Sequence, residues 1–491
     1  MQDSKWDKDR LYHLVQEKLG DHLFLVVSNR EPYIHTMSGD KVVCNRPVSG
    51  LTEALDPVMR ASKGSWIAYG SGDADKKVVD SHDRVAVPPE KPEYTLRRVW
   101  LTEDEVEGFY LGFSNEALWP LCHVTFTPPL FRESDWNTYK KVNKVFAEAV
   151  LQEVADRKAM VLVQDYHFAL VSRFIKEQNP EITVGQFWHI PWPTHEIFRT
   201  CPWQEEILDG LLGNDLLGFH IQPFCDNFLD SVGHNLKAKI DRNKHSVTYK
   251  GKATLVQPFP ISVDFDSLAQ YAGTEAVERE MDSLRHELHL EGKYIGVGMD
   301  RLDYTKGIPE RLQALDKLFE EFPSYKGKVV FIQAGMPSRT RIERYQEVNQ
   351  RIEDLMKSLN DKYNWKPVIP MTRQLPHVTL AALRRLANFC VVSSLHDGMN
   401  LVAKEFVSSR VDGDGVLILS QFTGAATELK EALLINPYDI GGFARKIKEA
   451  LEMPDAERRR RMKAMRQVVA NNNIYRWGAD SVSRLISIAE V

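Results

Sequence analysis

The chain has 491 residues, a formal net charge of -5 and five cysteines, and this length exceeds what one hydrophobic core usually supports, so two domains are expected. Lys and Arg are spread along the chain, which argues against a nucleic-acid partner, and no apolar stretch is long enough to span a membrane or to form a signal peptide at the charged N-terminus. The scattered cysteines show neither metal-ligand spacing nor a disulfide framework, which suits a reducing cytoplasm.

Strand and helix signals alternate through the first half of the chain, from Phe24 to about Pro260. Apolar runs at 24–27, 160–163 and 184–188 each end abruptly in polar residues. Nearly continuous apolar runs are typical of parallel strands that are buried on both faces. This half is therefore expected to form one α/β domain.

A proline-rich interruption at 258–260 marks the expected domain boundary, and the pattern then restarts. The elements predicted beyond it are helices at 276–288 and about 312–322, and strands at 294–299, 329–332 and 389–392. We predict an N-terminal Rossmann-like domain over 1–262 and a C-terminal one over 263–470. The last segment, 471–491, is expected to form a helix that packs back on the N-terminal domain.

Polar residues with chemical potential stand directly after several of the predicted strands or close behind them. In open α/β sheets, ligands gather at the carboxyl ends of the strands. The candidates at these positions are Arg30, Asp165, His189, Arg301, Arg339 and Asp397. Their shared position predicts that they line ligand sites.

The segment 397–405 follows a predicted strand and opens a predicted helix. Backbone N–H groups at a helix N-terminus carry partial positive charge, so those of Gly398 to Leu401 could hold a diphosphate. Glu405 lies about two turns farther along, where a carboxylate can accept hydrogen bonds from ribose hydroxyls. The segment is typical of a sugar-nucleotide site, although Asp and Gly at such a place can also do no more than cap a helix.

Arg301 and Lys306 lie five residues apart across a strand-to-helix turn, so both can reach one diphosphate. Cations fixed there would neutralise the charge that grows on a leaving diphosphate, and no metal or cofactor is predicted. The alternative is a surface ion pair with Asp303 or Glu310.

The chain resembles the trehalose-6-phosphate synthase family nearly from end to end. The motifs that carry this resemblance are 28–30, 113–115 with 118–120, 165–167, 189–194, 301–307, 397–405 and 419–422. The resemblance implies a GT-B fold, in which two Rossmann-like domains face each other across a cleft. It also implies retaining transfer of glucose from UDP-glucose, or from another NDP-glucose, to glucose 6-phosphate. Glucosylglycerol-phosphate synthases share this scaffold, so glycerol 3-phosphate stays open as acceptor, and a third reading is a homologue that senses sugar phosphates without turnover.

The resemblance assigns residues to a donor half and an acceptor half. The donor-binding residues are Gly50, Arg301, Lys306, Asp397, Gly398, Met399, Asn400, Leu401, Val402 and Glu405. The acceptor-binding residues are Arg30, Tyr69, Tyr110, Trp119, Asp165 and Arg339. The residues expected at the reaction itself are His189, Asp165, Arg301, Lys306 and Asp397, of which His189 and Asp397 contact the transferred glucose.

Two of these residues have an ordinary structural reading as well. A lone histidine after an apolar strand is often a satisfied core residue, and only the setting of His189 before Pro191 and Pro193 favours a functional role. Trp119 taken alone is more typical of a core than of a ligand site. The charge run at 457–461 is interpreted as a solvated helix face.

The departures from the family pattern lie mostly on the acceptor side. Ser49 replaces a loop glycine, Tyr69 replaces a tryptophan, Gln164 replaces a histidine, and His396 replaces an arginine before the donor aspartate. None of them removes a charged donor contact. Glycosyl transfer is therefore expected, and the acceptor identity stays open.

The expected partners are small molecules, a nucleotide sugar and a sugar phosphate, with no nucleic acid and no membrane. A separate phosphatase is expected to act on the product, and a homo-oligomer is possible. In the family, the leaving phosphate itself takes the proton of the acceptor hydroxyl, which needs no protein nucleophile.

Overall fold

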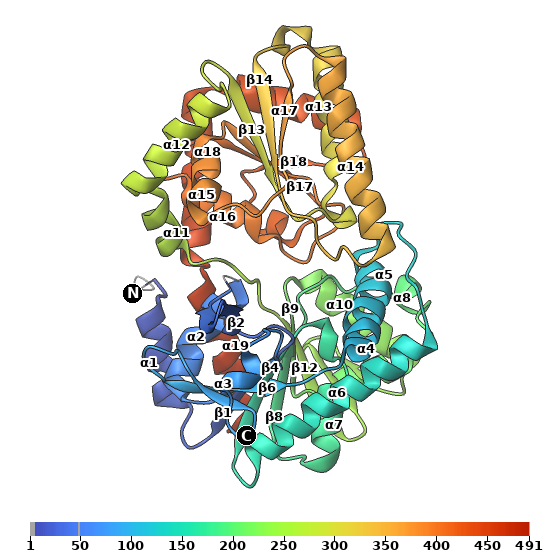
Figure 1. Ribbon diagram of the computed structural model, residues 1–491. Coiled ribbons are helices and arrows are strands. Elements are labelled where there is room, and N and C mark those ends of the chain that lie inside the picture. Colours follow the sequence, from blue (N-terminus) through green and yellow to red (C-terminus); the bar gives the residue numbers. More distant parts are fainter. Residues whose placement is uncertain (1–4, 48–49, 491) are drawn as a thin grey trace. The chain divides into compact units, whose positions relative to one another are not determined.

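The structure is a computed structural model that describes residues 5–47 and 50–490. The chain divides into unit 1, Met1–Ile261 with Ile474–Val491, and unit 2, Ser262–Asn473 (Figure 1). The sequence predicted domain boundaries after residues 262 and 470. In the structure, the chain passes between the units after residues 261 and 473. Ser49, one of the departures from the family pattern, lies outside the described residues.

Unit 1 is built on a ten-stranded sheet with the order β10-β11-β12-β9-β8-β7-β1-β4-β6-β5. Its strands are β1 (Leu23–Ser28), β4 (Ser65–Tyr69), β5 (Arg84–Val87), β6 (Tyr94–Val99), β7 (Ala159–Gln164), β8 (Thr183–Phe187), β9 (Leu216–Phe219), β10 (Lys239–Asp241), β11 (Ser246–Tyr249) and β12 (Lys252–Pro258). The strands from β12 to β6 run parallel, and antiparallel strands close both edges. The parallel strands are wound outward in both directions from the β1–β7 pair, which is the topological switch point of this sheet.

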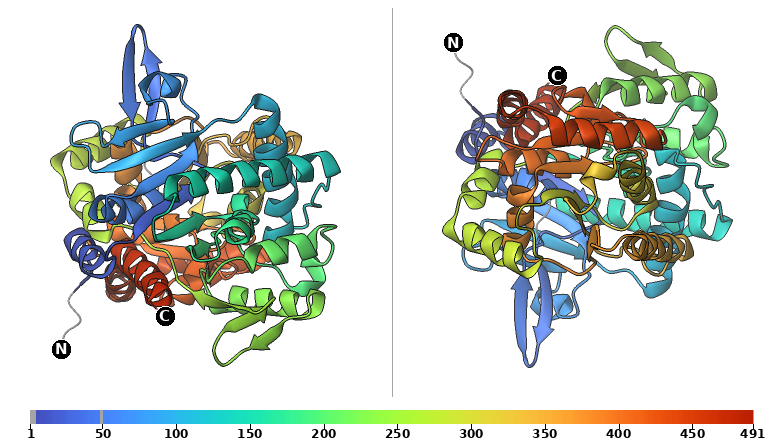
Figure 2. Two further views of the ribbon diagram at one scale, coloured as in Figure 1. Left: turned by 90° about the horizontal axis from the view of Figure 1, so that it is seen from below. Right: turned by 90° about the horizontal axis from the view of Figure 1, so that it is seen from above.

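A separate hairpin, β2 (Ile34–Ser38) and β3 (Lys41–Asn45), projects from the rest of unit 1 (Figure 2). The helical elements of unit 1 are α1 (Lys8–Lys18), α2 (Gly50–Ser62), α3 (Asp75–Val78), α4 (Glu103–Glu105), the π-helix η1 (Val106–Leu118), α5 (Trp119–His123), α6 (Glu133–Val154), η2 (Tyr166–Phe168), α7 (Val171–Gln178), α8 (His195–Phe198), α9 (Gln204–Leu211), α10 (Gln222–Asn235) and α19 (Ile474–Ala489).

The last helix, α19, belongs to unit 1 although it follows unit 2 in sequence. It packs against α1, α2 and β8. Leu485 is fully buried, and a Cβ built on Gly185 of β8 would lie 3.0 Å from its Cδ1. The ring of Trp477 lies 5.2 Å from that of Phe187 and 6.3 Å from that of His189. The end of the chain therefore supports the strand end that carries His189.

Unit 2 is built on a six-stranded, fully parallel sheet with the order β15-β14-β13-β16-β17-β18. Its strands are β13 (Tyr294–Met299), β14 (Val329–Ala334), β15 (Val368–Met371), β16 (Phe389–Val392), β17 (Val416–Ser420) and β18 (Leu433–Ile435). Numbered within the unit, this order is 3-2-1-4-5-6, the arrangement of dinucleotide-binding folds. The switch point lies between β13 and β16.

The helical elements of unit 2 are α11 (Phe265–Ala272), α12 (Glu275–Glu287), η3 (Tyr304–Lys306), α13 (Ile308–Glu321), η4 (Pro323–Tyr325), α14 (Glu343–Lys362), α15 (His377–Leu386), α16 (Leu401–Ser409), η5 (Gly424–Thr427), α17 (Ile440–Glu452) and α18 (Asp455–Asn471). The predicted charge run lies on α18, where Arg460 and Arg461 pair with Glu457 on the helix surface, as the solvated-face interpretation requires. Among the helices described, none is long and apolar enough to cross a membrane.

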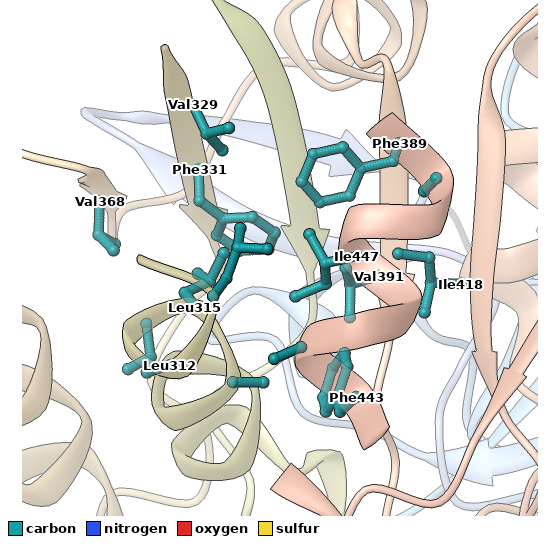
Figure 3. Close-up of a cluster of buried hydrophobic side chains, with 14 of the residues drawn as sticks. Leu312, Leu315, Val329, Phe331, Val368, Phe389, Val391, Ile418, Phe443 and Ile447 are labelled. Carbon is teal, nitrogen blue, oxygen red and sulfur yellow. The ribbon is translucent and has the colours of Figure 1, made fainter. Parts of the chain in front are cut away.

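The core of unit 2 lies between its sheet and the helices α13 and α17 (Figure 3). Phe331 of β14 and Phe389 of β16 are fully buried, and β13 lies between these two strands. Gly296 of β13 lies beside both rings, and a Cβ built on it would approach Phe389 to 2.3 Å and Phe331 to 2.6 Å. The glycine is required because two large rings occupy the space where a side chain would stand.

Candidate active site

The candidate site of unit 2 lies at its switch point, where the chain leaves β13 and β16. Lys306 Nζ lies 2.6 Å from Asp397 Oδ2, so residues 91 positions apart form an ion pair. Ser394 Oγ and Asn400 Nδ2 also donate to Asp397 Oδ2, each at 3.2 Å. Asp397 thus accepts one charged and two neutral hydrogen bonds, which fixes its orientation.

The turn before Lys306 is set by its neighbours. Asp303 Oδ1 accepts from the backbone N–H of Thr305 at 2.9 Å, which caps η3. Gly307 follows with φ +60°, and a Cβ there would lie 2.1 Å from the carbonyl oxygen of Ser393. Glycine is needed both for the left-handed backbone and for this close approach to the end of β16.

The predicted helix start in 397–405 is present, since α16 begins at Leu401. Its cap is Asn400, with φ +82°, whose Oδ1 accepts from the backbone N–H of Ala403 at 3.1 Å. Asp397 does not cap the helix and is directed to Lys306 instead. Amides of the first turn of a helix have no intrahelical partner, and here they follow Asn400, whose side chain shares the Asp397 carboxylate with Lys306.

Three cations gather around one buried carboxylate in unit 2. Arg339, with φ +49°, places Nη1 3.7 Å from Asp303 Oδ2, and the hydroxyl of Tyr345 donates to the same oxygen at 3.2 Å. Burial raises the pKa of Asp303, but the charges of Arg339, Arg301 and Lys306 outweigh burial and hold that pKa below its ordinary value. The predicted diphosphate residues therefore share one positively charged strand edge with Arg339.

The alternative for Arg301 and Lys306 was a surface ion pair with Asp303 or Glu310, and the structure decides it for Lys306. Lys306 pairs with Asp397, not with Asp303 or Glu310. Arg301 is an exposed residue just after β13. The predicted ribose ligand Glu405 forms a salt bridge with Arg384 of α15, which holds its carboxylate at one place on α16.

The candidate acceptor site is a cavity of about 320 Å³ within unit 1. Arg30, Tyr69 and Tyr110 line it, together with Glu31 and Ser71. Three predicted acceptor residues that are distant in sequence are thereby brought together. Arg30 follows β1, which is one of the two strands at the switch point of this sheet.

Trp119 is not among the residues that line this cavity. It is 7% exposed, and its ring lies 4.1 Å from that of His123 and 5.9 Å from that of Tyr166. Gly50, which the resemblance assigns to the donor half, is the first residue of α2. The structure thus places Trp119 in an aromatic cluster beside the strand end of β7.

Asp165 and His189 form a second group at the same edge of the unit 1 sheet. Asp165 has φ +75°, and its Oδ1 accepts from the backbone N–H groups of Tyr166 at 2.9 Å and His189 at 3.1 Å. His220 Nε2 donates to the carbonyl oxygen of His189 at 2.9 Å, and Gln164 Oε1 lies 2.9 Å from His189 Nε2. Three residues, Gln164 and Asp165 at the end of β7 and His220 at the end of β9, therefore hold His189.

Sequence reasoning missed a buried charge cluster behind the acceptor cavity. Arg98 Nε donates to Glu31 Oε2 and Arg98 Nη2 to Asp75 Oδ1, both at 2.8 Å. The backbone N–H of Ser71 donates to Glu31 Oε1 at 2.9 Å, and that of Gly72 to Asp75 Oδ2 at 2.6 Å. The cluster therefore fixes the loop that follows Tyr69. Burial and a hydrogen bond with Asp75 raise the pKa of Glu31 to about 7.

The model of glycosyltransferase family 20 matches residues 22–487. The chain belongs to glycosyltransferase family 20. The trehalose-6-phosphate synthase of Mycobacterium avium is 37% identical to this family 20 chain over 477 residues, which are 95% of this chain and 96% of that protein. The bifunctional trehalose-6-phosphate synthase/phosphatase of Thermoproteus tenax is also 37% identical over 477 residues, and there the match covers 94% of this chain and 63% of that protein.

Solved structures agree. An E. coli structure bound with UDP-2-fluoro glucose matches with a TM-score of 0.85 and 31% identity, over 94% of this family 20 chain and 98% of that chain. A Burkholderia xenovorans α,α-trehalose-phosphate synthase in complex with glucose-6-phosphate matches with a TM-score of 0.83 and 28% identity, over 94% and 99% of the two chains. The predicted α/β fold of the GT-B type, with two Rossmann-like units, is confirmed.

Proposed function

We propose that this protein is a retaining glycosyltransferase that moves glucose from UDP-glucose to glucose 6-phosphate and so forms trehalose 6-phosphate. The observation that carries the proposal is the meeting of Lys306 with Asp397 at the switch point of unit 2, beside Arg301. Nucleotides bind at this place in folds with the same strand order. Family membership and the substrates named for the matched structures point to the same reaction.

In the donor half, the diphosphate would lie against Arg301, Lys306 and the amides that open α16. When the bond between glucose and the diphosphate breaks, negative charge grows on the leaving group, and fixed cations stabilise that transition state more than the ground state. Asp397, held by three hydrogen bonds, would then accept from glucose hydroxyls. Glu405 would accept from the ribose.

In the acceptor half, Arg30 and Tyr110 in the unit 1 cavity would bind the phosphate of glucose 6-phosphate. The role of Arg339 in binding this phosphate stays a prediction from the sequence. Asp165 would accept from hydroxyls of the acceptor sugar. Trp119, which belongs to the aromatic cluster at the end of β7, would lie beside that sugar. His189 would contact the transferred glucose from its fixed position between Asp165 and His220.

The chemical step in this proposal uses no protein nucleophile. The bond between the anomeric carbon and the diphosphate oxygen breaks, the acceptor oxygen bonds to the same face of the sugar, and the released diphosphate takes the acceptor proton. Arg301 and Lys306 supply the compensating charge, so the proposal assigns no role to a metal. Trehalose phosphate with an inverted linkage would contradict it.

Release of UDP tests the proposal when UDP-glucose is supplied with glucose 6-phosphate, with glycerol 3-phosphate or with no acceptor. We expect release that depends on glucose 6-phosphate, because one matched synthase structure is a complex with glucose-6-phosphate. Dependence on glycerol 3-phosphate would instead show that changes such as Tyr69 in the cavity lining reset the acceptor. The absence of release in every tube would favour a sensor. A downstream phosphatase, an oligomer and a cytoplasmic location stay predictions.

A further inference from the structure

Gln164, the last residue of β7, contacts His189, which follows β8. The two strands are neighbours, with Gln164 in register with Phe187. The side chain of Gln164 is buried, with 1% of the residue exposed, whereas His189 is half-buried. Gln164 Oε1 lies 2.9 Å from His189 Nε2. The Gln164 amide, which cannot titrate, therefore contacts the imidazole of His189. In the proposed function, this imidazole contacts the transferred sugar.

This contact determines where the imidazole carries its proton. An amide oxygen only accepts hydrogen bonds, so Nε2 of His189 must be the donor. Burial, with the nearby imidazoles of His220 and His167, lowers the pKa of His189 well below its ordinary value, so the ring is neutral. The nearby anion, Asp165, accepts from the backbone of His189. A neutral ring with a proton on Nε2 has its lone pair on Nδ1.

The other ring nitrogen stays available. In the part of the chain that the structure describes, no group forms a hydrogen bond with Nδ1 of His189. The ring of His189 lies 4.5 Å from that of Phe187, 6.3 Å from that of Trp477 and 5.7 Å from that of His220. Nδ1 can therefore accept a hydrogen bond from a ligand but cannot donate one.

The amide of Gln164 is also retained at a cost. Its Nε2 is buried and has no hydrogen-bond partner among the described residues. A buried amide without a partner destabilises the fold, so packing alone would favour an apolar side chain of the same length. Polar groups that break this rule are expected mainly where function needs them.

We propose that Gln164 is a positioning residue, which holds His189 in the Nε2–H form so that Nδ1 accepts a hydrogen bond from a hydroxyl of the transferred sugar. This inference rests on the proposed function. The family pattern has a histidine at this position, and a histidine can donate a hydrogen bond, accept one or become charged. The amide of Gln164 does not titrate, so its oxygen accepts from Nε2–H of His189 across the pH range in which the protein is folded.

The first test observes the ring itself and needs no turnover. Nitrogen NMR of the full chain, labelled with ¹⁵N-histidine and assigned with His189→Asn, should show the Nε2–H form of His189. Gln164→Met removes the acceptor and should shift the proton toward Nδ1, whereas Gln164→Glu keeps an acceptor and should keep the Nε2–H form. An Nδ1–H ring in the unchanged protein, or no shift in Gln164→Met, would overturn the proposal even if the transferase activity is real.

The second test separates positioning from stability. Gln164→Met should lower kcat about tenfold, the effect of one hydrogen bond, with the KM of the acceptor unchanged and the urea midpoint unchanged or higher, because an unpaired buried amide is removed. Gln164→Glu should restore kcat at high pH and add a titration to the pH profile, because a carboxylate raises the pKa of the ring. Gln178→Met, on the exposed end of α7, is the matched control. A kcat loss that follows a fall in the urea midpoint, or unchanged kcat, would contradict positioning.

Discussion

At the scale of single residues, the candidate site depends on charges that the fold forces together. Lys306 and Asp397 pair at 2.6 Å, and both are largely buried, with 13% and 14% of their side chains exposed. Glu31, Asp75 and Arg98 are buried completely in the second cluster. Removing one member leaves the others buried without compensation, so each cluster yields a measurable prediction.

Lys306→Ala should lower kcat/KM for UDP-glucose on the order of 10²-fold, because it removes a cation from the leaving diphosphate. Steady-state kinetics with a saturating acceptor provides the measurement. Lys317→Ala is the control, since Lys317 lies on the surface of α13 and pairs with Glu320 and Glu321. Equal losses in the two variants would show that the effect is not specific to the site.

Glu31 predicts a pH dependence of stability. Its pKa is about 7 in the folded protein and 4.5 is its ordinary value, so the folded state binds more protons between these two pH values. The free energy of unfolding should therefore fall as pH rises from about 4.5 to about 7, by at most about 1.4 kcal/mol for each pH unit from this group.

Urea unfolding of the unchanged protein and of Glu31→Gln, from pH 4.5 to 8, measures this contribution. The difference between the two should change across the window, because the amide cannot titrate. The exposed Glu205→Gln serves as control. A constant difference between Glu31→Gln and the unchanged protein would contradict the raised pKa.

At the scale of elements, the sequence predicted the parts that depend on local pattern. The apolar runs 24–27, 160–163 and 389–392 lie in β1, β7 and β16 because strands buried on both faces need apolar residues throughout. The β2–β3 hairpin was not predicted, since both strands mix polar with apolar residues, with β2 mostly half-buried and β3 mostly exposed. Long-range partners could not be read either: Arg98 meets Glu31 only because β6 and β1 flank β4.

The same limit applies to the candidate site. Motifs identified Arg301, Lys306 and Asp397, but no local pattern shows that Lys306 pairs with Asp397. Such contacts arise from the crossover between β13 and β16, which is a property of the sheet order. Arg97 and Arg98 inside β6 were the available signal for the buried cluster.

Gly296→Val tests the packing of β13. A side chain there would meet Phe389 and Phe331 at less than 3 Å, so the variant should lose about 1–3 kcal/mol of stability through overpacking. Urea unfolding measures the loss. Gly273→Ala is the control, because a Cβ at Gly273 would meet only ordinary contacts at 3.6 Å or more. A Gly296→Val protein as stable as this control would contradict the described core.

At the scale of the whole molecule, the chain builds two sheets of related topology and returns to the first unit at its end. Each sheet has a switch point, and each switch point carries one group of candidate residues, after β1 and β7 in unit 1 and after β13 and β16 in unit 2. The last helix, α19, places Trp477 against Phe187 and His189. Residues at the end of the chain therefore matter for a site near its middle.

Leu485→Ala, at the buried face of α19, should cost about 2–5 kcal/mol. Because α19 packs on α1, α2 and β8, amide hydrogen exchange should become faster in those elements. Ile447→Ala in the core of unit 2 is the matched substitution and should affect β13 to β18 instead. Equal acceleration of exchange throughout the chain in both variants would contradict two separate cores.

The central claim is that this chain transfers glucose from UDP-glucose to glucose 6-phosphate with retention. Mass spectrometry with NMR of the products formed from UDP-glucose and glucose 6-phosphate tests it most directly. The account predicts a phosphorylated disaccharide with an α,α-1,1 linkage, which is lost in Lys306→Ala. A product with another acceptor, an inverted linkage, or no product from correctly folded protein would contradict the account.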